Sequence, residues 1–354
     1  MIPELINRYK RMRTERFLRQ TYQYQYAFVG MGQHSLTNLY PVLHYLGVPL
    51  KYICITSERK AKLIERKYPS VKATTSLDKI LKDEAVRGVF VSASPSAHFS
   101  IASQVLQSRK SLFIEKPPCQ TLEELDTLIA LQQQYGSPVV MVGLQKRYAP
   151  AVQLLQKRLS NERLINYDLH YLTGAYPERL QVGDRRSGMG DAILDLYINP
   201  LDLVCHLFGK PEILACQMVS ENSYILMLQH PNIVGTLELS TAYSWTAAKE
   251  SLKVCTHSGI YHLSQMDTLT YEAKPSTILG IPIEKLCPRS NTIEYLYQRN
   301  AFIPTLVNNR LYTQGYFHEI AAFVDAAEGC SSHILNSVQH TRNIYEIFHK
   351  IKLI

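Results

Sequence analysis

Short apolar runs alternate with amphipathic stretches between residues 26 and 147. The runs predict buried strands, and the stretches between them place apolar residues at helical spacing. Thr121 and Glu124 stand at the spacing of a capping box, so a helix is expected to begin there. We predict strands at 26–30, 51–55, 86–91, 111–114 and 139–142, and helices at 36–46, 58–68, 97–107 and 121–135. Strands that alternate with helices indicate an α/β domain with a doubly wound parallel sheet.

The pattern changes after about residue 150, where apolar and polar residues alternate along single segments. Such alternation is typical of an antiparallel sheet with one covered face. We predict strands at 166–172, 224–229, 233–239 and 252–256, and helices at 193–208, 316–327 and 338–351. The second domain is therefore expected to be α+β with an open, mainly antiparallel sheet. The expected domains are an N-terminal arm (1–25), the α/β domain (26–147) and an α+β substrate and oligomerisation domain (148–354).

Composition indicates a globular protein of two domains. The chain has 354 residues, of which 46% are hydrophobic and 19% charged. It has no apolar run of membrane-helix length and no N-terminal apolar segment of the kind found in a secretory signal. Its seven cysteines are scattered, without a CxxC pair, which argues against a disulfide framework or a zinc site. We expect a cytoplasmic protein.

Positive charge is concentrated at the N-terminus. The net charge is +8, and residues 1–20 hold six basic residues against two acidic ones. A basic helical arm can contact nucleic acid, acidic lipid or a partner subunit, or it can pack on its own domain. Because no aromatic ladder, zinc finger or helix-turn-helix spacing accompanies the arm, we expect neither a nucleic-acid nor a membrane partner. The expected partners are a small-molecule substrate and further copies of the chain, in a homodimer or homotetramer.

A glycine turn follows the first predicted strand and opens the first helix. Gly30 can take the tight turn, and Gly32 lets backbone amides approach a pyrophosphate at the helix N-terminus. A small residue, Ser35, occupies the place of the third glycine of a dinucleotide-binding motif. The sequence thus predicts a Rossmann domain that binds a nicotinamide dinucleotide through Gly30, Gly32, Gln33, His34 and Ser35.

The second predicted strand ends without the acidic residue that would bind the ribose 2′-hydroxyl of NAD. Thr56 and Ser57 follow instead, and Arg59 and Lys60 come after Glu58. Hydroxyl and cationic groups can receive the 2′-phosphate of NADP, so NADP is the expected cofactor, with NAD as the alternative. Equally, Ser57 can be an ordinary helix N-cap.

Glu115-Lys116-Pro117 ends the predicted strand 111–114, and further motifs stand at matching distances. In these motifs the chain resembles the Gfo/Idh/MocA family of glucose-fructose oxidoreductases and inositol dehydrogenases. The resemblance implies that Lys116 lies beside the nicotinamide and the substrate hydroxyl. It also places further residues among those that contact the cofactor: Ser94, Pro95, His98, Glu115 and Arg147. The further motifs are Ser94-Pro95 with His98, Gly143 with Arg147-Tyr148, and the glycine-containing segment 188–202.

The resemblance includes one departure, at Asn199. Asp195 matches the family aspartate, but Asn199 stands where the family has its catalytic histidine. Residues four apart share a helix face, so Asp195 and Asn199 are expected to point together. Asparagine does not titrate and can only position an oxygen, so proton transfer falls to Lys116, Asp195, Tyr197 or water. Tyr197 ranks low because it lies near the opposite helix face. Lys116, Asp195 and Asn199 are the expected catalytic residues.

The expected activity is that of an NAD(P)-dependent oxidoreductase acting on a sugar, a cyclitol or a related small molecule. Two alternatives are a reductase of an imine or double bond, and a dinucleotide-binding regulator without turnover. Loss of the histidine favours the regulator, whereas Lys116 and Asp195 oppose it. No metal is expected, because the histidines show no ligand spacing: His170, His206, His257, His262 and His318.

Overall fold

The computed structural model describes most of the chain. The described residues are 2–19, 21–136, 139–174, 190–220, 222–244, 248–286, 293–299, 310–331 and 334–352. They form two compact units that interleave along the chain: 1–114, 131–140 and 320–334 make one, and 115–130, 141–319 and 335–354 the other. The expected domain boundaries stay a prediction. No described helix is long and apolar enough to span a membrane.

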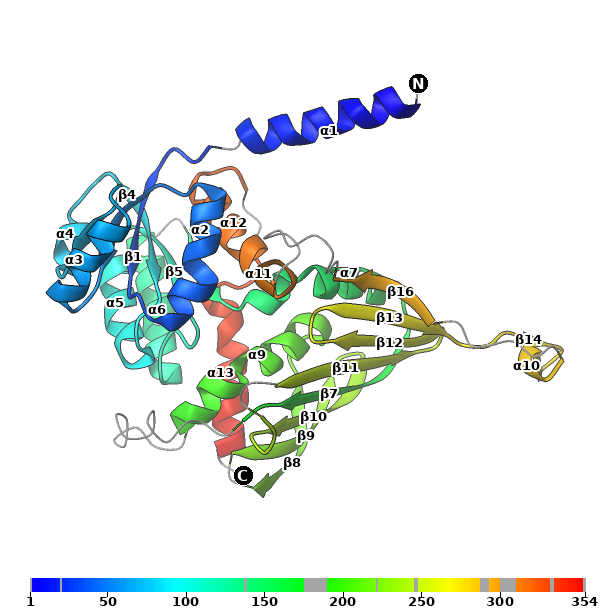
Figure 1. The fold of residues 1–354 in the computed structure, drawn as a ribbon. Coiled ribbons are helices and arrows are strands. Elements are labelled where there is room, and N and C mark those ends of the chain that lie inside the picture. The colour runs from blue at the N-terminus through cyan, green and yellow to red at the C-terminus, as the bar shows by residue number, and fades with distance from the viewer. Residues whose placement is uncertain are drawn as a thin grey trace. The chain divides into compact units, whose positions relative to one another are not determined.

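Six strands form the first sheet (Figure 1). They are β1 (Gln25–Val29), β2 (Leu50–Cys54), β3 (Lys72–Thr74), β4 (Val86–Val91), β5 (Ser111–Glu115) and β6 (Val140–Gly143). Their order is β3-β2-β1-β4-β5-β6, and β1 pairs in parallel with both β2 and β4. This is the strand order of a Rossmann dinucleotide-binding fold, so the predicted fold class is confirmed.

Helices connect these strands in the predicted order. They are α2 (Tyr40–Leu46), α3 (Glu58–Lys67), α4 (Leu77–Leu81), α5 (Pro95–Gln107) and α6 (Leu122–Tyr135), and a π-helical turn, η1 (Ser35–Leu39), leads into α2. Thr121 caps α6 as expected, accepting from the Glu124 backbone N–H at 3.2 Å. The Glu124 carboxylate accepts from the backbone N–H of Gln120. In a standard capping box it would accept from the N–H of the N-cap residue, which is Thr121 here. β3 and α4 were not predicted because elements this short show little periodicity.

Aromatic side chains fill the core beside the first sheet. Phe90 lies between the rings of Phe28 and Phe113, at centroid distances of 6.2 and 5.5 Å. Phe323 of α12 (Tyr316–Ala327) meets Phe90 edge-on at 5.0 Å. Aromatic pairs at these distances are stabilised beyond their buried area. A helix from late in the sequence thereby completes the core of the first sheet.

Eight strands form the second sheet, in the order β16-β13-β12-β11-β7-β10-β9-β8. They are β7 (Leu164–Leu172), β8 (Glu212–Ser220), β9 (Ser223–His230), β10 (Ile233–Ser240), β11 (Lys249–Thr256), β12 (Gly259–Ser264), β13 (Thr268–Ala273) and β16 (Ile293–Gln298). The pair β7–β10 is parallel, and the other pairs are antiparallel. The predicted open, mainly antiparallel sheet is therefore present.

One face of the second sheet is covered and the other is polar. On β7, Tyr167 and Leu169 are buried, and the Tyr167 ring stacks on Phe208 of α9 (Gly190–Phe208) at 4.5 Å. Asp168 and His170 alternate with them on the opposite face. The other elements of this unit are η2 (Gln145–Tyr148), α7 (Pro150–Leu159), β14 (Thr277–Ile278), β15 (Ile281–Pro282), α10 (Ile283–Leu286), α11 (Arg310–Thr313) and α13 (Val338–Lys352). The basic arm forms α1 (Ile2–Arg19).

Candidate active site

The glycine turn after β1 is shaped for close approach of a ligand. Gly30 has φ +93°, and a Cβ there would lie 2.2 Å from the Ser92 carbonyl oxygen, so this position requires glycine. A Cβ on Gly32 would meet nothing within 4 Å. Gly32, Gln33 and His34 are exposed at the start of the helix that leads into α2. An open glycine turn at a helix N-terminus fits a pyrophosphate.

Ser35 replaces the third glycine without opening the packing between helix and strand. Its side chain is fully buried, and its Oγ donates a hydrogen bond to Ser92 Oγ at 2.9 Å, just beyond the end of β4. The hydroxyl is therefore satisfied where a larger side chain would be excluded. This contact explains how the motif tolerates a serine.

The residues after β2 form a helix start as well as a candidate phosphate site. Ser57 is the N-cap of α3 and accepts from the Lys60 backbone N–H at 3.4 Å. The alternative interpretation of Ser57, as an ordinary helix N-cap, is thus confirmed. Thr56, Arg59 and Lys60 are exposed. Their side chains are accessible to a ligand from solution.

Ser94 and Pro95 open α5, and His98 is held in its first turn. Pro95 stands at the start of the helix, where its missing N–H costs no helical hydrogen bond. The His98 side chain is 1% exposed, and its Nε2 lies 3.1 Å from the Ala93 carbonyl oxygen. That bond fixes the chain entering α5, which is a helix-supporting role.

Glu115 and Lys116 stand where β5 ends. The Glu115 carboxylate is buried, and a Cβ on Gly143 would lie 3.0 Å from it, so glycine at 143 makes room for this side chain. The Lys116 ammonium donates to the backbone oxygen of Asp195 at 2.9 Å and to Asp195 Oδ1 at 2.8 Å. The structure thus brings together two of the three predicted catalytic residues.

The third predicted residue, Asn199, lies one turn further along α9. Its Oδ1 is buried and makes no hydrogen bond with any other described residue. Tyr197 points elsewhere, because its hydroxyl donates to the backbone oxygen of Asn222. The low rank given to Tyr197 therefore agrees with its contacts. The predicted segment 188–202 begins with Gly188 and Met189, which lie outside the described residues.

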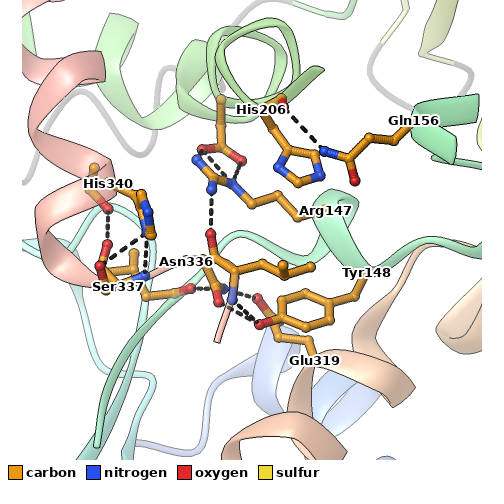
Figure 2. Close-up of polar contacts among 12 residues, drawn as sticks. Arg147, Tyr148, Gln156, His206, Glu319, Asn336, Ser337 and His340 are labelled. Atoms are coloured by element: carbon orange, nitrogen blue, oxygen red, sulfur yellow. Dashed lines mark hydrogen bonds and ion pairs between the residues drawn. The ribbon is translucent and has the colours of Figure 1, made fainter. Parts of the chain in front are cut away.

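Arg147 is engaged in a buried ion pair. Its Nε donates to both carboxylate oxygens of Asp202, at 3.0 and 2.9 Å, and its Nη1 donates to the Leu335 backbone oxygen (Figure 2). Both side chains of the pair are at most 6% exposed. These contacts use the guanidinium to join η2, α9 and the segment before α13. The structure gives Arg147 a structural role, and cofactor contact by Arg147 stays a prediction.

Asn336, in the segment before α13, makes hydrogen bonds to β6, α12 and η2. Its side-chain amide donates to the Val142 backbone oxygen and to Glu319 Oε1, and its Oδ1 accepts from the Tyr148 hydroxyl at 2.8 Å (Figure 2). Burial, and secondarily the charge of Glu115, raise the pKa of Glu319 well above its ordinary value. Both effects favour the protonated form of the Glu319 carboxyl.

A third ion pair, between Lys146 and Glu250, lies beside Tyr171, and sequence reasoning missed it. Lys146 Nζ is 2.5 Å from Glu250 Oε1, both side chains are buried, and the ammonium lies 4.8 Å from the centre of the Tyr171 ring. The sequence marks Tyr171 only by its position on the apolar face of the predicted strand 166–172. That pattern marks packing and carries no information about chemistry. Lys146 adjoins Arg147 in the predicted family motif, but nothing in the sequence pairs it with Glu250.

Among the described residues, no group of three or more His, Cys, Asp or Glu side chains could hold a metal ion. His170 instead bridges two carboxylates on the polar face of the second sheet, with Nδ1 2.6 Å from Glu238 and Nε2 2.8 Å from Asp168. His230 is buried and His206 is partly buried, and burial lowers the pKa of both side chains.

Comparison with known proteins agrees with this architecture. Residues 24–144 match the family model GFO_IDH_MocA, described as an oxidoreductase family with an NAD-binding Rossmann fold. The putative oxidoreductase YceM of Salmonella typhimurium is 26% identical over 50% of this chain and 56% of its own length. The UDP-N-acetylglucosamine 3-dehydrogenase of Acidithiobacillus ferrooxidans is 33% identical over 43% of each chain. The chain thus spans about half the length of these relatives.

Structural similarity extends further than sequence similarity. A dehydrogenase from Chromobacterium violaceum superposes with a TM-score of 0.78, covering 94% of this chain and 95% of its own, at 18% identity. At that identity the likeness establishes the fold, which includes both sheets. The family match covers the glycine turn and the Glu115-Lys116-Pro117 segment. Residues 24–144 are thus similar to the Gfo/Idh/MocA family of oxidoreductases.

Proposed function

We propose that the protein is an NAD(P)-dependent oxidoreductase that transfers a hydride between nicotinamide and a carbinol carbon of a sugar, a cyclitol or a related small molecule. The observation that carries the proposal is the contact of the Lys116 ammonium with Asp195 at 2.8 Å. An ion pair that is only about one-fifth exposed, at the end of the fifth Rossmann strand, is a suitable place to stabilise charge on a substrate oxygen.

The cofactor would be held by the turn after β1. Gly30, Gly32, Gln33, His34 and Ser35 would receive the pyrophosphate, because the turn is open and leads into a helix. When bound, the nicotinamide supplies the hydride acceptor or donor.

NADP is the preferred cofactor in this proposal. No carboxylate stands directly at the end of β2, since the first one is Glu58 in α3, and Thr56 and Arg59 are exposed there. Arg59 would pair with a 2′-phosphate, while Ser57 serves as the helix cap. At the other strand ends, Ser94, Pro95, His98 and Glu115 would shape the rest of the cofactor site.

Lys116 would stabilise the substrate oxygen. An ammonium has three N–H donors, and Asp195 takes two of them. The third can donate to a substrate carbonyl or hydroxyl. Asp195 orients the ammonium and balances its charge, so Lys116 binds the oxygen without leaving an uncompensated charge.

Asn199 would position the substrate without taking its proton. Its buried Oδ1 can accept one hydrogen bond from a ligand hydroxyl or N–H, which would satisfy an otherwise unpaired buried acceptor. An amide at this place suits a substrate that needs orientation more than a base. This observation also favours the second candidate, reduction of an imine or double bond.

The test is a screen of NADPH and NADH oxidation, and of NADP and NAD reduction. The substrates are sugars, cyclitols, UDP-N-acetylglucosamine and cyclic imines. The UDP-sugar is included because one relative is named a UDP-N-acetylglucosamine 3-dehydrogenase. Turnover of a sugar or cyclitol that Lys116→Met abolishes would support the proposal. Turnover restricted to imines would favour the reductase. Tight cofactor binding without turnover of any substrate would leave the regulator.

A homodimer or homotetramer is the expected assembly. Light scattering of the full chain measures it, and a monomeric mass would contradict this part of the proposal.

A further inference from the structure

The part of α9 that carries Asp195 and Asn199 is followed at once by a proline. Pro200 stands inside the helix. Proline has no backbone N–H, so the carbonyl oxygen of Leu196, four residues earlier, receives no helical hydrogen bond from it. The backbone ladder of α9 therefore lacks one bond beside the candidate catalytic residues.

Beyond the proline, a buried ion pair fixes the helix. Asp202 accepts from the Arg147 guanidinium, and both side chains are at most 6% exposed. This pair holds the C-terminal part of α9 to η2. Because the ladder is interrupted at Pro200, the part of the helix before it depends more strongly on contacts of its own.

The Tyr197 hydroxyl supplies one such contact. The side chain is fully buried, and its hydroxyl donates to the backbone oxygen of Asn222. Asn222 stands in the turn before β9 with φ +58°, and Ser220 pairs with Ser223 across that turn. The acceptor thus belongs to the backbone of a hydrogen-bonded hairpin. Through this bond the hairpin holds α9 against the second sheet.

The Tyr197 ring is held as well. It meets the ring of Tyr171 on β7 with the centroids 6.1 Å apart and the planes at 85°. Edge-to-face aromatic pairs of this kind are stabilised beyond their buried area. β7 lies inside the sheet, between β10 and β11. The ring and the hydroxyl of Tyr197 therefore contact two separate parts of the second sheet, which leaves the side chain little freedom to turn.

Tyr197 and Asp195 hold α9 from opposite sides. Residues two apart on a helix point in directions roughly 200° apart. Asp195 meets the Lys116 ammonium through its backbone oxygen and its carboxylate, whereas Tyr197 meets Asn222. Contacts on opposite sides fix the rotation of the helix about its own axis. Both bonds between Lys116 and Asp195 depend on that rotation.

We propose that Tyr197 is a positioning residue that keeps this part of α9 in the rotation at which Asp195 meets Lys116 and Asn199 faces the substrate. The inference rests on the proposed function. Tyr197 takes no part in proton transfer, because its O–H is bonded to a backbone oxygen on the far side of the helix. Its loss should lower kcat, since small misplacements of reacting groups reduce the rate, and should leave cofactor binding unchanged.

The experiment compares Tyr197→Phe with Tyr167→Phe, using NADPH and the substrate found in the screen. Tyr197→Phe keeps the ring and removes only the hydroxyl. The control removes the hydroxyl of another buried tyrosine, one that bonds to His230 and stacks on Phe208 at the C-terminal end of α9. Thermal unfolding midpoints are measured for both variants, and activity is assayed at a temperature at which both are folded.

The kcat of Tyr197→Phe should fall about tenfold, the factor that one neutral hydrogen bond is worth in rate. The Kd for NADPH and the KM for the substrate should stay within about twofold of the parent values. The kcat of Tyr167→Phe should match the parent. A merely structural hydroxyl would lower the unfolding midpoint and leave kcat unchanged.

A second measurement combines Tyr197→Phe with Asp195→Asn. The single Asp195→Asn variant keeps the backbone oxygen that accepts from Lys116, so enough turnover should remain to be measured. If Tyr197 acts through Asp195, both changes disturb one contact. The loss of kcat in the double variant should then be smaller than the product of the two single losses.

The outcomes separate the two proposals. If Lys116→Met abolishes turnover while Tyr197→Phe matches the parent, the inference on Tyr197 is overturned and the proposed function stands. An equal loss of kcat in Tyr167→Phe, or losses that multiply in the double variant, would also overturn it. If the parent turns over none of the substrates, or Lys116→Met keeps full activity, both proposals fail.

Discussion

Lys116 bonds to Asp195 twice, through the backbone oxygen at 2.9 Å and through the side-chain carboxylate at 2.8 Å. The two residues are 79 positions apart, one after a strand of the first sheet and one in α9. The bond to the backbone oxygen depends on the position of α9 and does not depend on which side chain stands at position 195. Lys116 therefore stays near α9 even when the carboxylate of Asp195 is removed.

Lys116→Met should reduce turnover far more than Asn199→Ala. Removing one electrostatic contact to a developing oxyanion costs on the order of a hundredfold or more, so Lys116→Met should fall at least that far. Asn199→Ala removes neutral hydrogen bonds of roughly 1 kcal/mol each, hence about tenfold. Steady-state kcat/KM with the substrate from the screen measures both. Equal activity of Lys116→Met and the parent would end the catalytic interpretation.

Asn199→His tests the meaning of the family departure. An imidazole titrates near neutrality and can take the hydroxyl proton, so oxidation of a sugar alcohol should rise relative to reduction. The ratio of the two kcat values measures this change. A ratio that stays constant would show that position 199 does not limit proton transfer.

Gly32→Leu should abolish cofactor binding without unfolding the protein. A Cβ at Gly32 meets no protein atom within 4 Å, so the side chain has room in the free protein and would occupy the space of the pyrophosphate. Titration of NADPH fluorescence measures the affinity, and the thermal unfolding midpoint serves as the folding control. Unchanged affinity in a folded variant would remove the turn from the cofactor site.

Arg59→Ala should weaken NADPH binding while leaving NADH binding within about twofold. Loss of a charge-assisted bond to phosphate costs roughly 1.5–3 kcal/mol, which is about tenfold or more in Kd. Arg66→Ala, in the last turn of the same helix, is the matched control. A parent protein that prefers NADH, with Arg59→Ala indistinguishable from it, would contradict the assignment of NADP.

Deletion of residues 1–20 should leave hydride transfer intact. The side chains of residues 3–12 of α1 are exposed, apolar ones included: Leu5, Ile6, Tyr9 and Met12. An exposed apolar set on a helix indicates a surface for subunit contact, so a smaller assembly is the expected result. Light scattering and the activity assay are run on the same sample. A folded, unchanged assembly without activity would mean that the arm contributes to catalysis.

Glu319→Gln should make the protein more stable than the parent at alkaline pH. The raised pKa means that the folded state keeps a proton that the unfolded chain releases above its ordinary carboxyl pKa of 4.5. The parent's stability from this group is thus complete below pH 4.5 and is lost as pH rises, by at most about 1.4 kcal/mol per pH unit. Thermal unfolding between about pH 5 and 9 measures the difference. The exposed Glu84→Gln is the control, and parallel curves for parent and Glu319→Gln would refute the prediction.

The sequence predicted the first sheet closely because its strands are buried on both faces and its helices are amphipathic. Strands 86–91 and 111–114 appear almost unchanged as β4 and β5. The second sheet was predicted only in part. β8 is largely exposed along its length, so its residues do not alternate in polarity and no pattern marked it. The parallel pairing of β7 with β10 depends on how the chain connects the strands. The periodicity of apolar residues within one strand does not determine that connection.

At the candidate site, motifs identified individual residues but not their partners. Lys116 and Asp195 were both predicted, yet their direct bond depends on the position of α9. Arg147 shows the reverse case, since its motif suggested a ligand contact and its guanidinium is taken by Asp202. Tyr171 carried no motif at all. Only tertiary structure brings it beside Lys146, Glu250 and Tyr197.

Asn336 makes the segment before α13 a part of the scaffold around the candidate site. One amide side chain serves Val142, Glu319 and the Tyr148 hydroxyl, and its own backbone oxygen accepts from the Val142 N–H at 3.0 Å. A shortened chain that ended at residue 334 would leave these buried polar groups without partners, each at a cost of about 1–3 kcal/mol. Loss of Asn336 by truncation should therefore destabilise the unit that contains the candidate catalytic residues.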